Sequence, residues 1–190
     1  MNFEFSEEQQ MLRDQARSYL TQHCPTTLVR RVLNNRETHD ADLYKGIAEM
    51  GWTATTIPEE YGGLGMSHLE LVVIAEELGR ACAPVPFSSS VYLAAEAIMA
   101  LGTEAQKQAW LPKLADGSAI GCFALGEAGG AVTPDQISTS IADGVINGTK
   151  VPVADGGIAD VAIVVCKSDG GDGATLALVD LGQDAVAKDN

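Results

Sequence analysis

The sequence predicts an α+β protein, with an all-α helical part first and a β part after it. Apolar residues recur at helical spacing up to about residue 115, and beyond about residue 119 they recur at strand spacing. β-branched residues and turns of Gly, Asp and Asn become frequent only in the second stretch. We therefore expect an N-terminal α-helical domain over residues 1–117 and a partial antiparallel β-domain over residues 118–190.

Capping residues predict where the helices begin. In a capping box, a Ser or Thr and a Glu or Gln three positions later satisfy the first free backbone N–H groups of a helix. The sequence has three such pairs, which are Ser6 with Gln9, Ser67 with Glu70, and Thr103 with Gln106. Together with the apolar spacing and the glycines that end them, they predict helices near residues 7–20, 41–50, 68–78, 89–100 and 104–114. The helix near 68–78 has little polar surface, so we expect it to be buried on most sides.

Short apolar runs in the second half predict about four strands. The runs cover residues 119–126, 137–153, 160–168 and 174–181. Asp143-Gly144 and Asn147-Gly148 are typical of hairpin turns, so we expect antiparallel neighbours, with residues 151–153 as a strand. A sheet of so few short strands leaves one face that must be covered by the helices or by another chain segment.

Composition excludes several classes of partner. A formal net charge of −14 argues against nucleic acid and against an anionic membrane surface. The first residues contain no apolar run long enough for a signal peptide or a membrane span, which predicts a cytoplasmic protein. The four cysteines are far apart in the sequence and have no nearby histidine pattern, so we expect reduced thiols and no metal site.

Two motifs are more specific than the general pattern. The first is YGGLG at residues 61–65, followed by a helix with EELG at 76–79. The second is GTE at 102–104, which leads to LPKLADG at 111–117 and then to the first β segment. With these motifs, the chain resembles the acyl-CoA dehydrogenase family over essentially its whole length.

The resemblance implies a helical N-terminal domain, a middle β-domain and a C-terminal four-helix domain, which together bind FAD and an acyl-CoA thioester. In the implied reaction a carboxylate removes the α proton while a hydride passes from the β carbon to the flavin. The C-terminal helical domain, which supplies the catalytic Glu in the family, is absent from this chain. No residue here is therefore assigned as catalytic, and we expect the chain alone to be inactive.

The same resemblance places the flavin-contacting segments of the family on two stretches of the β half. In the first, Phe123 and Leu125 would offer backbone and apolar contacts, and Gly126 stands where the family has a Thr hydroxyl. In the second, Pro152 stands where the family has a Trp that shields the ring, and Ala154 replaces a Thr or Ser. These five residues are the candidate cofactor-binding positions.

Two alternatives stay open at these positions. Glu127 is retained from the family pattern, but Gly126 with Gly129 and Gly130 also fits a bulge and turn that simply ends a strand. Pro152 also suits an edge strand that lacks one backbone hydrogen bond.

Two functions follow from these observations. The first is an FAD-dependent acyl-CoA dehydrogenase chain, or part of one, in fatty acid or steroid side-chain catabolism. The second is a non-catalytic structural subunit of a heteromeric acyl-CoA dehydrogenase, with a degenerate flavin site. The expected partners are an acyl-CoA substrate and, in a homo- or hetero-oligomer, a related acyl-CoA dehydrogenase subunit. The identity of the acyl group is not indicated.

Overall fold

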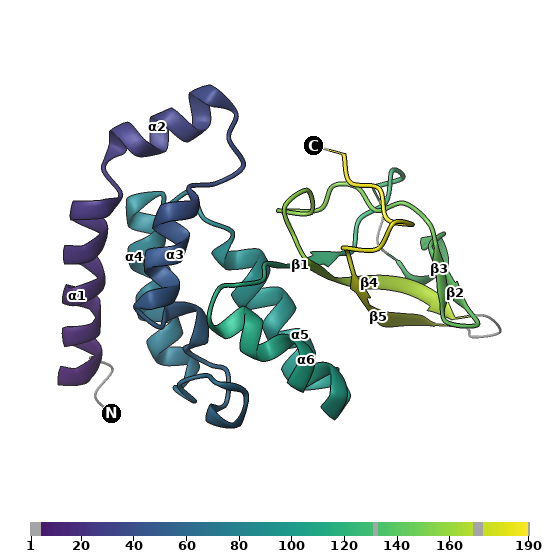
Figure 1. The fold of residues 1–190 in the computed structure, drawn as a ribbon, viewed down its shortest axis with the longest axis horizontal. Coiled ribbons are helices and arrows are strands. Elements are labelled where there is room, and N and C mark those ends of the chain that lie inside the picture. Colours follow the sequence, from purple (N-terminus) through teal and green to yellow (C-terminus); the bar gives the residue numbers. More distant parts are fainter. Residues whose placement is uncertain (1–4, 131–132, 169–172, 190) are drawn as a thin grey trace. The chain divides into compact units, whose positions relative to one another are not determined.

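The computed structural model describes residues 5–130, 133–168 and 173–189, and the chain divides into two compact units (Figure 1). Unit 1 is formed by Met1–Phe87 and Thr103–Ser118, and unit 2 by Ser88–Gly102 and Ala119–Asn190. The predicted α+β class is confirmed. The prediction about a signal peptide depends in part on residues 1–4, which lie outside the described residues.

Unit 1 is helical. Its α-helices are α1 (Glu7–His23), α2 (Thr26–Asn35), α3 (Ala41–Glu49), α4 (His68–Ala81) and α6 (Glu104–Ala115). Its short 3-10 helices are η1 (Trp52–Ala54) and η2 (Glu59–Tyr61). The three predicted capping boxes are all formed, at the starts of α1, α4 and α6. Helix α2 was not predicted, because its first turn follows Pro25 and has no side-chain cap.

Helices α1 and α4 lie side by side and run in the same direction (Figure 1). Near their starts the Gln9 amide donates to a Glu70 oxygen at 2.8 Å, and two turns further along Arg17 binds Glu77. The expectation that α4 is buried on most sides is wrong, because Leu69 and Val72 are exposed. The core of unit 1 is built from fully buried aliphatic side chains, which include Leu20, Ile47, Ile57, Ile74, Leu111 and Leu114.

Unit 2 begins with a helix of unusual type. The predicted helix near 89–100 is present as the π-helix η3 (Ser88–Ala95), followed directly by α5 (Glu96–Leu101). The strands are β1 (Gly121–Ala124), β2 (Ser140–Ala142), β3 (Val145–Asn147), β4 (Val161–Ser168) and β5 (Ala174–Asp180), with the 3-10 helix η4 (Pro134–Gln136) before β2. π-Helices are rare, and short π-helical turns are frequent at functional sites.

The sheet is mixed, which corrects the prediction of a purely antiparallel sheet. Strand β4 is parallel to β1, with Gly121 opposite Val161, and parallel to β2, with Ser140 opposite Lys167. The pairs β2–β3 and β4–β5 are antiparallel, as predicted. Hairpin turns are visible in sequence because they are local, whereas parallel strands are joined by long connections that leave no short turn motif.

The two predicted turns have different outcomes. Asp143-Gly144 forms the turn between β2 and β3, with positive φ angles of 49° and 77°. Asn147-Gly148 does not form a hairpin, because the chain after β3 enters an irregular segment over residues 148–160. The expectation that residues 151–153 form a strand is therefore wrong. The Val151 N–H instead donates to the carbonyl of Gly126, two residues beyond β1, at 2.9 Å.

A small apolar cluster holds this part of unit 2 together. Its buried members are Cys122, Ala124, Ala159, Ala162 and Val164.

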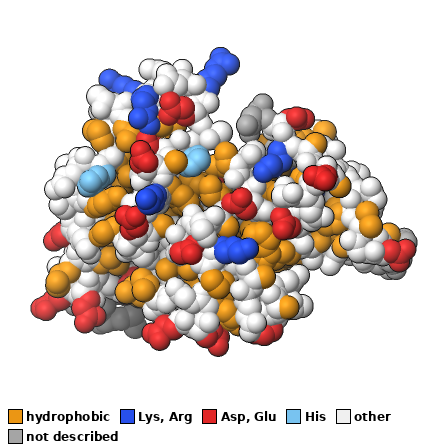
Figure 2. All heavy atoms as spheres, viewed as in Figure 1, with side chains coloured by type: hydrophobic (Ala, Val, Ile, Leu, Met, Phe, Trp, Pro, Cys, Tyr) orange, Lys and Arg blue, Asp and Glu red, His pale blue; other side chains and the backbone are white. Residues whose placement is uncertain are grey.

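No helix among the described residues has the length and apolar character needed to cross a membrane. Acidic side chains are scattered over the face drawn in Figure 2, in keeping with the net charge of −14.

Candidate functional site

The five predicted cofactor-binding residues all belong to unit 2. Phe123 lies in β1 between Cys122 and Ala124, which belong to the core cluster, and Leu125 is the first residue after the strand. Because successive side chains of a strand point to opposite faces, Phe123 lies on the side of β1 that faces away from the cluster. Phe123 is half-buried and Leu125 is exposed.

Pro152 and Ala154 show the same pattern in the irregular segment. Val153 packs against the core cluster, and its two neighbours Pro152 and Ala154 are exposed. Residues 121–126 and 152–154 therefore pack against the same core cluster. The predicted residues lie on the side of these two segments that faces away from the cluster.

Gly126 is the point where the two segments meet. A Cβ atom added to Gly126 would lie 3.0 Å from the Val151 carbonyl oxygen and 3.5 Å from Pro152 Cδ. A side chain at this position would require a neighbour to move by a few tenths of an ångström. The structure thus brings Gly126 and Pro152 together. The other three predicted residues, Phe123, Leu125 and Ala154, all lie on the side that faces away from the core cluster.

This surface can offer apolar contacts and backbone groups to a ring system. Leu125 and Pro152 are exposed apolar side chains that flank the hydrogen bond between Gly126 and Val151. None of the five side chains carries a hydroxyl group, and Pro152 supplies no aromatic ring. The residues present therefore fit a flavin by their apolar character, and its polar contacts here would come from the backbone.

Next to this surface lies an ion pair whose role the sequence analysis missed. The Glu127 carboxylate accepts a hydrogen bond from Lys150 Nζ at 2.7 Å, and Lys150 Nζ also donates to the Leu125 carbonyl at 3.2 Å. The amides and hydroxyls of Ser138 and Thr139 donate to the same carboxylate. The retained Glu in the sequence was the available signal, but its partners are 11, 12 and 23 residues away.

Hydrogen bonding controls the ionisation of this carboxyl group. The Lys150 ammonium, and then the hydroxyls of Ser138 and Thr139, hold the pKa of Glu127 far below its usual range. Glu127 is therefore ionised at neutral pH, and it is engaged as an acceptor on both oxygens. In this arrangement it holds backbone in place and has little basicity for proton transfer.

The π-helix supports the same region from another direction. Ser90 Oγ accepts a hydrogen bond from the Gly121 amide at 3.1 Å, at the start of β1. Ser89 Oγ donates to the Asp155 carboxylate, and Asp155 has a left-handed backbone with φ of 57°. Both serines are buried, so η3 anchors the strand and the irregular segment that carry the predicted residues.

Two acidic features in unit 1 do not form a catalytic pair. Glu76 is exposed whereas Glu77 is buried, as expected for neighbours on a helix, and Glu77 is bound by Arg17 and Arg80. Burial opposes ionisation of Glu77, but the hydrogen bond from Arg17 outweighs it and lowers the pKa of that carboxyl group. Among the described residues, no group of three or more His, Cys, Asp or Glu side chains could hold a metal ion.

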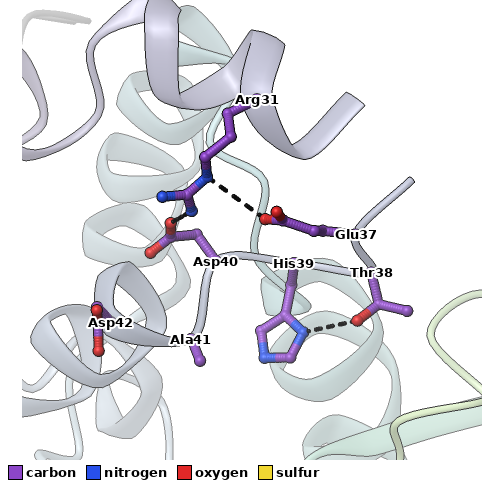
Figure 3. Close-up of a pocket in the computed structure, with 7 residues that line it drawn as sticks. All are labelled: Arg31, Glu37, Thr38, His39, Asp40, Ala41 and Asp42. Carbon is purple, nitrogen blue, oxygen red and sulfur yellow. Dashed lines mark hydrogen bonds and ion pairs between the residues drawn. The ribbon is translucent and has the colours of Figure 1, made fainter. Parts of the chain in front are cut away.

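A polar surface pocket of about 390 Å³ lies between α2 and the start of α3 (Figure 3). Its lining residues are Arg31, Glu37, Thr38, His39, Asp40, Ala41 and Asp42. Arg31 forms ion pairs with Asp40 and, at 3.4 Å, with Glu37. Because its guanidinium group is already joined to two acids, we assign no ligand to this pocket.

Comparison with known proteins gives the class of this fold. Residues 6–118 match the family model described as the N-terminal domain of acyl-CoA dehydrogenase. The chain belongs to the acyl-CoA dehydrogenase family, as the two sequence motifs predicted.

Individual relatives extend the match into unit 2. The chain is similar to acryloyl-CoA reductase (NADH) of Anaerotignum propionicum, with 32% identity over 176 residues, which is 89% of this chain and 44% of the relative. An acyl-CoA dehydrogenase from Bacillus anthracis, solved in complex with FAD, has 28% identity and a TM-score of 0.84 over 98% of this chain and 33% of its own. The ChsE4–ChsE5 complex from Mycobacterium tuberculosis has 29% identity and a TM-score of 0.85 over 98% of this chain and 50% of the matched one. This chain thus spans about half the length of such relatives, or less.

Proposed function

We propose that this chain provides the N-terminal helical part and the middle β part of an FAD-dependent acyl-CoA dehydrogenase. The reaction is the α,β-dehydrogenation of an acyl-CoA thioester to the 2-enoyl-CoA. The observation that carries the proposal is the match of 98% of the chain, at a TM-score of 0.84, to an acyl-CoA dehydrogenase that is complexed with FAD. We place the enzyme in the cytoplasm, and its substrate in fatty acid or steroid side-chain catabolism.

In this proposal the outward surface of unit 2 holds the flavin. Leu125 and Pro152 contact the ring system by apolar surface, and the backbone at Phe123, Gly126 and Ala154 contributes the polar contacts. Bound FAD supplies the hydride acceptor. The chain's own residues bind and orient the ring system and shield it from water, while the base that removes the α proton is assigned to no residue of this chain.

A second candidate function is supported by the side chains at the same surface. Gly126, Pro152 and Ala154 stand where the family resemblance implies a hydroxyl, an aromatic ring and a second hydroxyl. A subunit that serves only to pack against a catalytic partner would have no need of these groups. The similarity to a chain of the ChsE4–ChsE5 complex supports a related acyl-CoA dehydrogenase subunit as that partner.

The visible absorption spectrum distinguishes the two functions. We expect the purified chain, alone or mixed with a related acyl-CoA dehydrogenase subunit, to retain a flavin absorption band after gel filtration with FAD. A band that appears with the chain alone contradicts the purely structural role. Absence of the band in both preparations contradicts the enzyme role.

A substitution tests whether the predicted surface is the one that binds. Ala154→Thr restores a hydroxyl at an exposed position, and one added hydrogen bond should tighten FAD binding by up to about tenfold. Ala142→Thr, at an exposed alanine on β2, is the matched control and should leave the affinity unchanged. Equal affinities of the two variants would place the flavin elsewhere.

A further inference from the structure

The Glu127 carboxylate, three residues beyond the end of β1, accepts five hydrogen bonds. Its Oε1 accepts from Lys150 Nζ at 2.7 Å, from the Thr139 amide at 3.0 Å and from Thr139 Oγ1 at 2.7 Å. Its Oε2 accepts from the Ser138 amide at 2.8 Å and from Ser138 Oγ at 2.5 Å. We call Glu127, Lys150, Ser138 and Thr139 the carboxylate clamp.

The clamp joins three segments that are separate in the sequence. Glu127 follows β1, Ser138 and Thr139 precede β2, and Lys150 lies in the irregular segment, two residues before Pro152. Thr139 is itself held to β4, because its carbonyl accepts from the Lys167 amide at 2.9 Å. The segment after β1 and the irregular segment are thus both joined to the residues before β2 through one carboxylate.

Burial makes the clamp a strong constraint. The side chains of Lys150 and Glu127 are only 8% and 12% exposed. Charge-assisted hydrogen bonds are stronger than neutral ones. When a nearly buried charge loses its partner, the folded protein is strongly destabilised. The two charges therefore stay together, and with them the backbone to which they are attached.

The backbone next to the clamp is the candidate flavin surface. Lys150 Nζ donates to the Leu125 carbonyl at 3.2 Å, and the Val151 amide donates to the Gly126 carbonyl at 2.9 Å. Since the five side chains of this surface have no hydroxyl group, a ring system on it depends on the position of the backbone.

We propose that Glu127 is a positioning residue, whose carboxylate acts through Lys150 to hold Leu125-Gly126 against Val151-Pro152 and thereby shapes the surface that binds the flavin. The proposal rests on the proposed function, because it takes FAD as the ligand of this surface. Glu127 itself does not belong to that surface, and it acts only through the backbone that it fixes.

Two variants and a control test the proposal on the purified protein. Glu127→Gln keeps the size of the side chain and removes its charge, and Ser138→Ala removes one of the five hydrogen bonds to it. Asp184→Asn makes the same change of charge at an exposed residue of unit 2 outside the clamp. FAD affinity is measured by the quenching of flavin fluorescence, and backbone exchange at residues 125–127 and 148–152 by hydrogen–deuterium exchange of the protein without FAD.

Glu127→Gln should weaken FAD binding by about tenfold or more and accelerate exchange in both segments, since a hydrogen bond to a charged group is lost. Ser138→Ala, which leaves the ion pair in place, should weaken binding by a smaller factor, and Asp184→Asn should change neither quantity. The circular dichroism spectrum of each variant reports whether the fold is retained.

Faster exchange in Glu127→Gln with unchanged FAD affinity would give the clamp a purely structural role and overturn the proposal, while the proposed function stands. The proposal is also overturned if exchange in the two segments is unchanged. If the wild-type protein binds no FAD, alone or with its partner subunit, the proposed function fails and the positioning role fails with it.

Discussion

The buried carboxylate of Glu77 allows a quantitative test of what holds α1 against α4. Glu77 is 0% exposed, whereas its partners Arg17 and Arg80 are 51% and 43% exposed. Arg17 Nη2 donates to Glu77 Oε1 at 2.6 Å, and Arg80 Nε donates to Oε2 at 2.5 Å. If both arginines are removed, the carboxylate cannot reach water, but if Glu77 is removed, both guanidinium groups can.

The two changes should therefore differ in cost. In the Arg17→Met/Arg80→Met variant the buried carboxylate loses its charged partners, and breaking a buried ion pair in this way costs about 3–5 kcal/mol in the free energy of unfolding at pH 7. Glu77→Gln leaves no buried charge, and the loss of its charge-assisted hydrogen bonds should cost about 1–2 kcal/mol.

The pH dependence provides a second and independent test. The hydrogen bond from Arg17 lowers the pKa of Glu77 in the folded state. The stability contributed by this shift is present above the pKa of the unfolded chain and is lost as the pH falls through the folded pKa. In the double arginine variant, burial without a partner raises the pKa of Glu77. As the pH falls, Glu77 is therefore protonated at a higher pH in the variant than in the wild type, and the cost of its buried charge disappears. The difference in stability between wild type and variant should narrow as the pH falls from about 7 to about 4.

Urea unfolding followed by tryptophan fluorescence measures these differences in the correct part of the molecule. The chain has 2 tryptophans, Trp52 and Trp110, and both belong to unit 1. Lys45→Met breaks an exposed ion pair with Glu49 on α3 and serves as the control, with an expected cost below about 0.5 kcal/mol. The reasoning is refuted if the double arginine variant is as stable as this control at pH 7, or if the difference from wild type widens on acidification.

Further predictions concern other features of the chain. Gly63→Ala should lower the free energy of unfolding by about 1–3 kcal/mol in the same urea assay, because the added Cβ would lie 1.9 Å from the Ile57 carbonyl oxygen; an unchanged midpoint would contradict this close approach. The hydrogen bond that Tyr61 donates to Glu104 raises the pKa of Tyr61 to about 12, so Glu104→Gln should lower the midpoint of one tyrosine in an ultraviolet pH titration. Cys82 is exposed and the other three cysteines are buried, so a thiol reagent should modify Cys82 first, as peptide mass spectrometry would show.

Features that depend on neighbouring residues were predictable from sequence. The three capping boxes begin α1, α4 and α6 as expected, because a cap is formed by residues three positions apart. The Asp143-Gly144 turn is likewise a local property of two residues. Helix α2 lacks a side-chain cap and was missed for that reason.

The site shows the same division. The sequence placed five residues on two segments as flavin contacts by resemblance, and that assignment stays a prediction. Their outward placement, and the meeting of Gly126 with Val151, depend on packing against a cluster to which Ala159 and Val164 also contribute. Glu127 was visible as a retained residue, but its role in joining three segments was not.

Local sequence was sufficient for the helical first half, the β second half, the starts of α1, α4 and α6, and the family. The tertiary structure alone decided the parallel pairing of β4 with β1 and β2, the irregular path at Pro152 and the partners of Glu127 and Glu77. The physical reason is the range of the interactions. Capping, turn formation and apolar periodicity act over a few residues, whereas strand register and the satisfaction of a buried charge depend on groups brought together from distant positions when the chain packs.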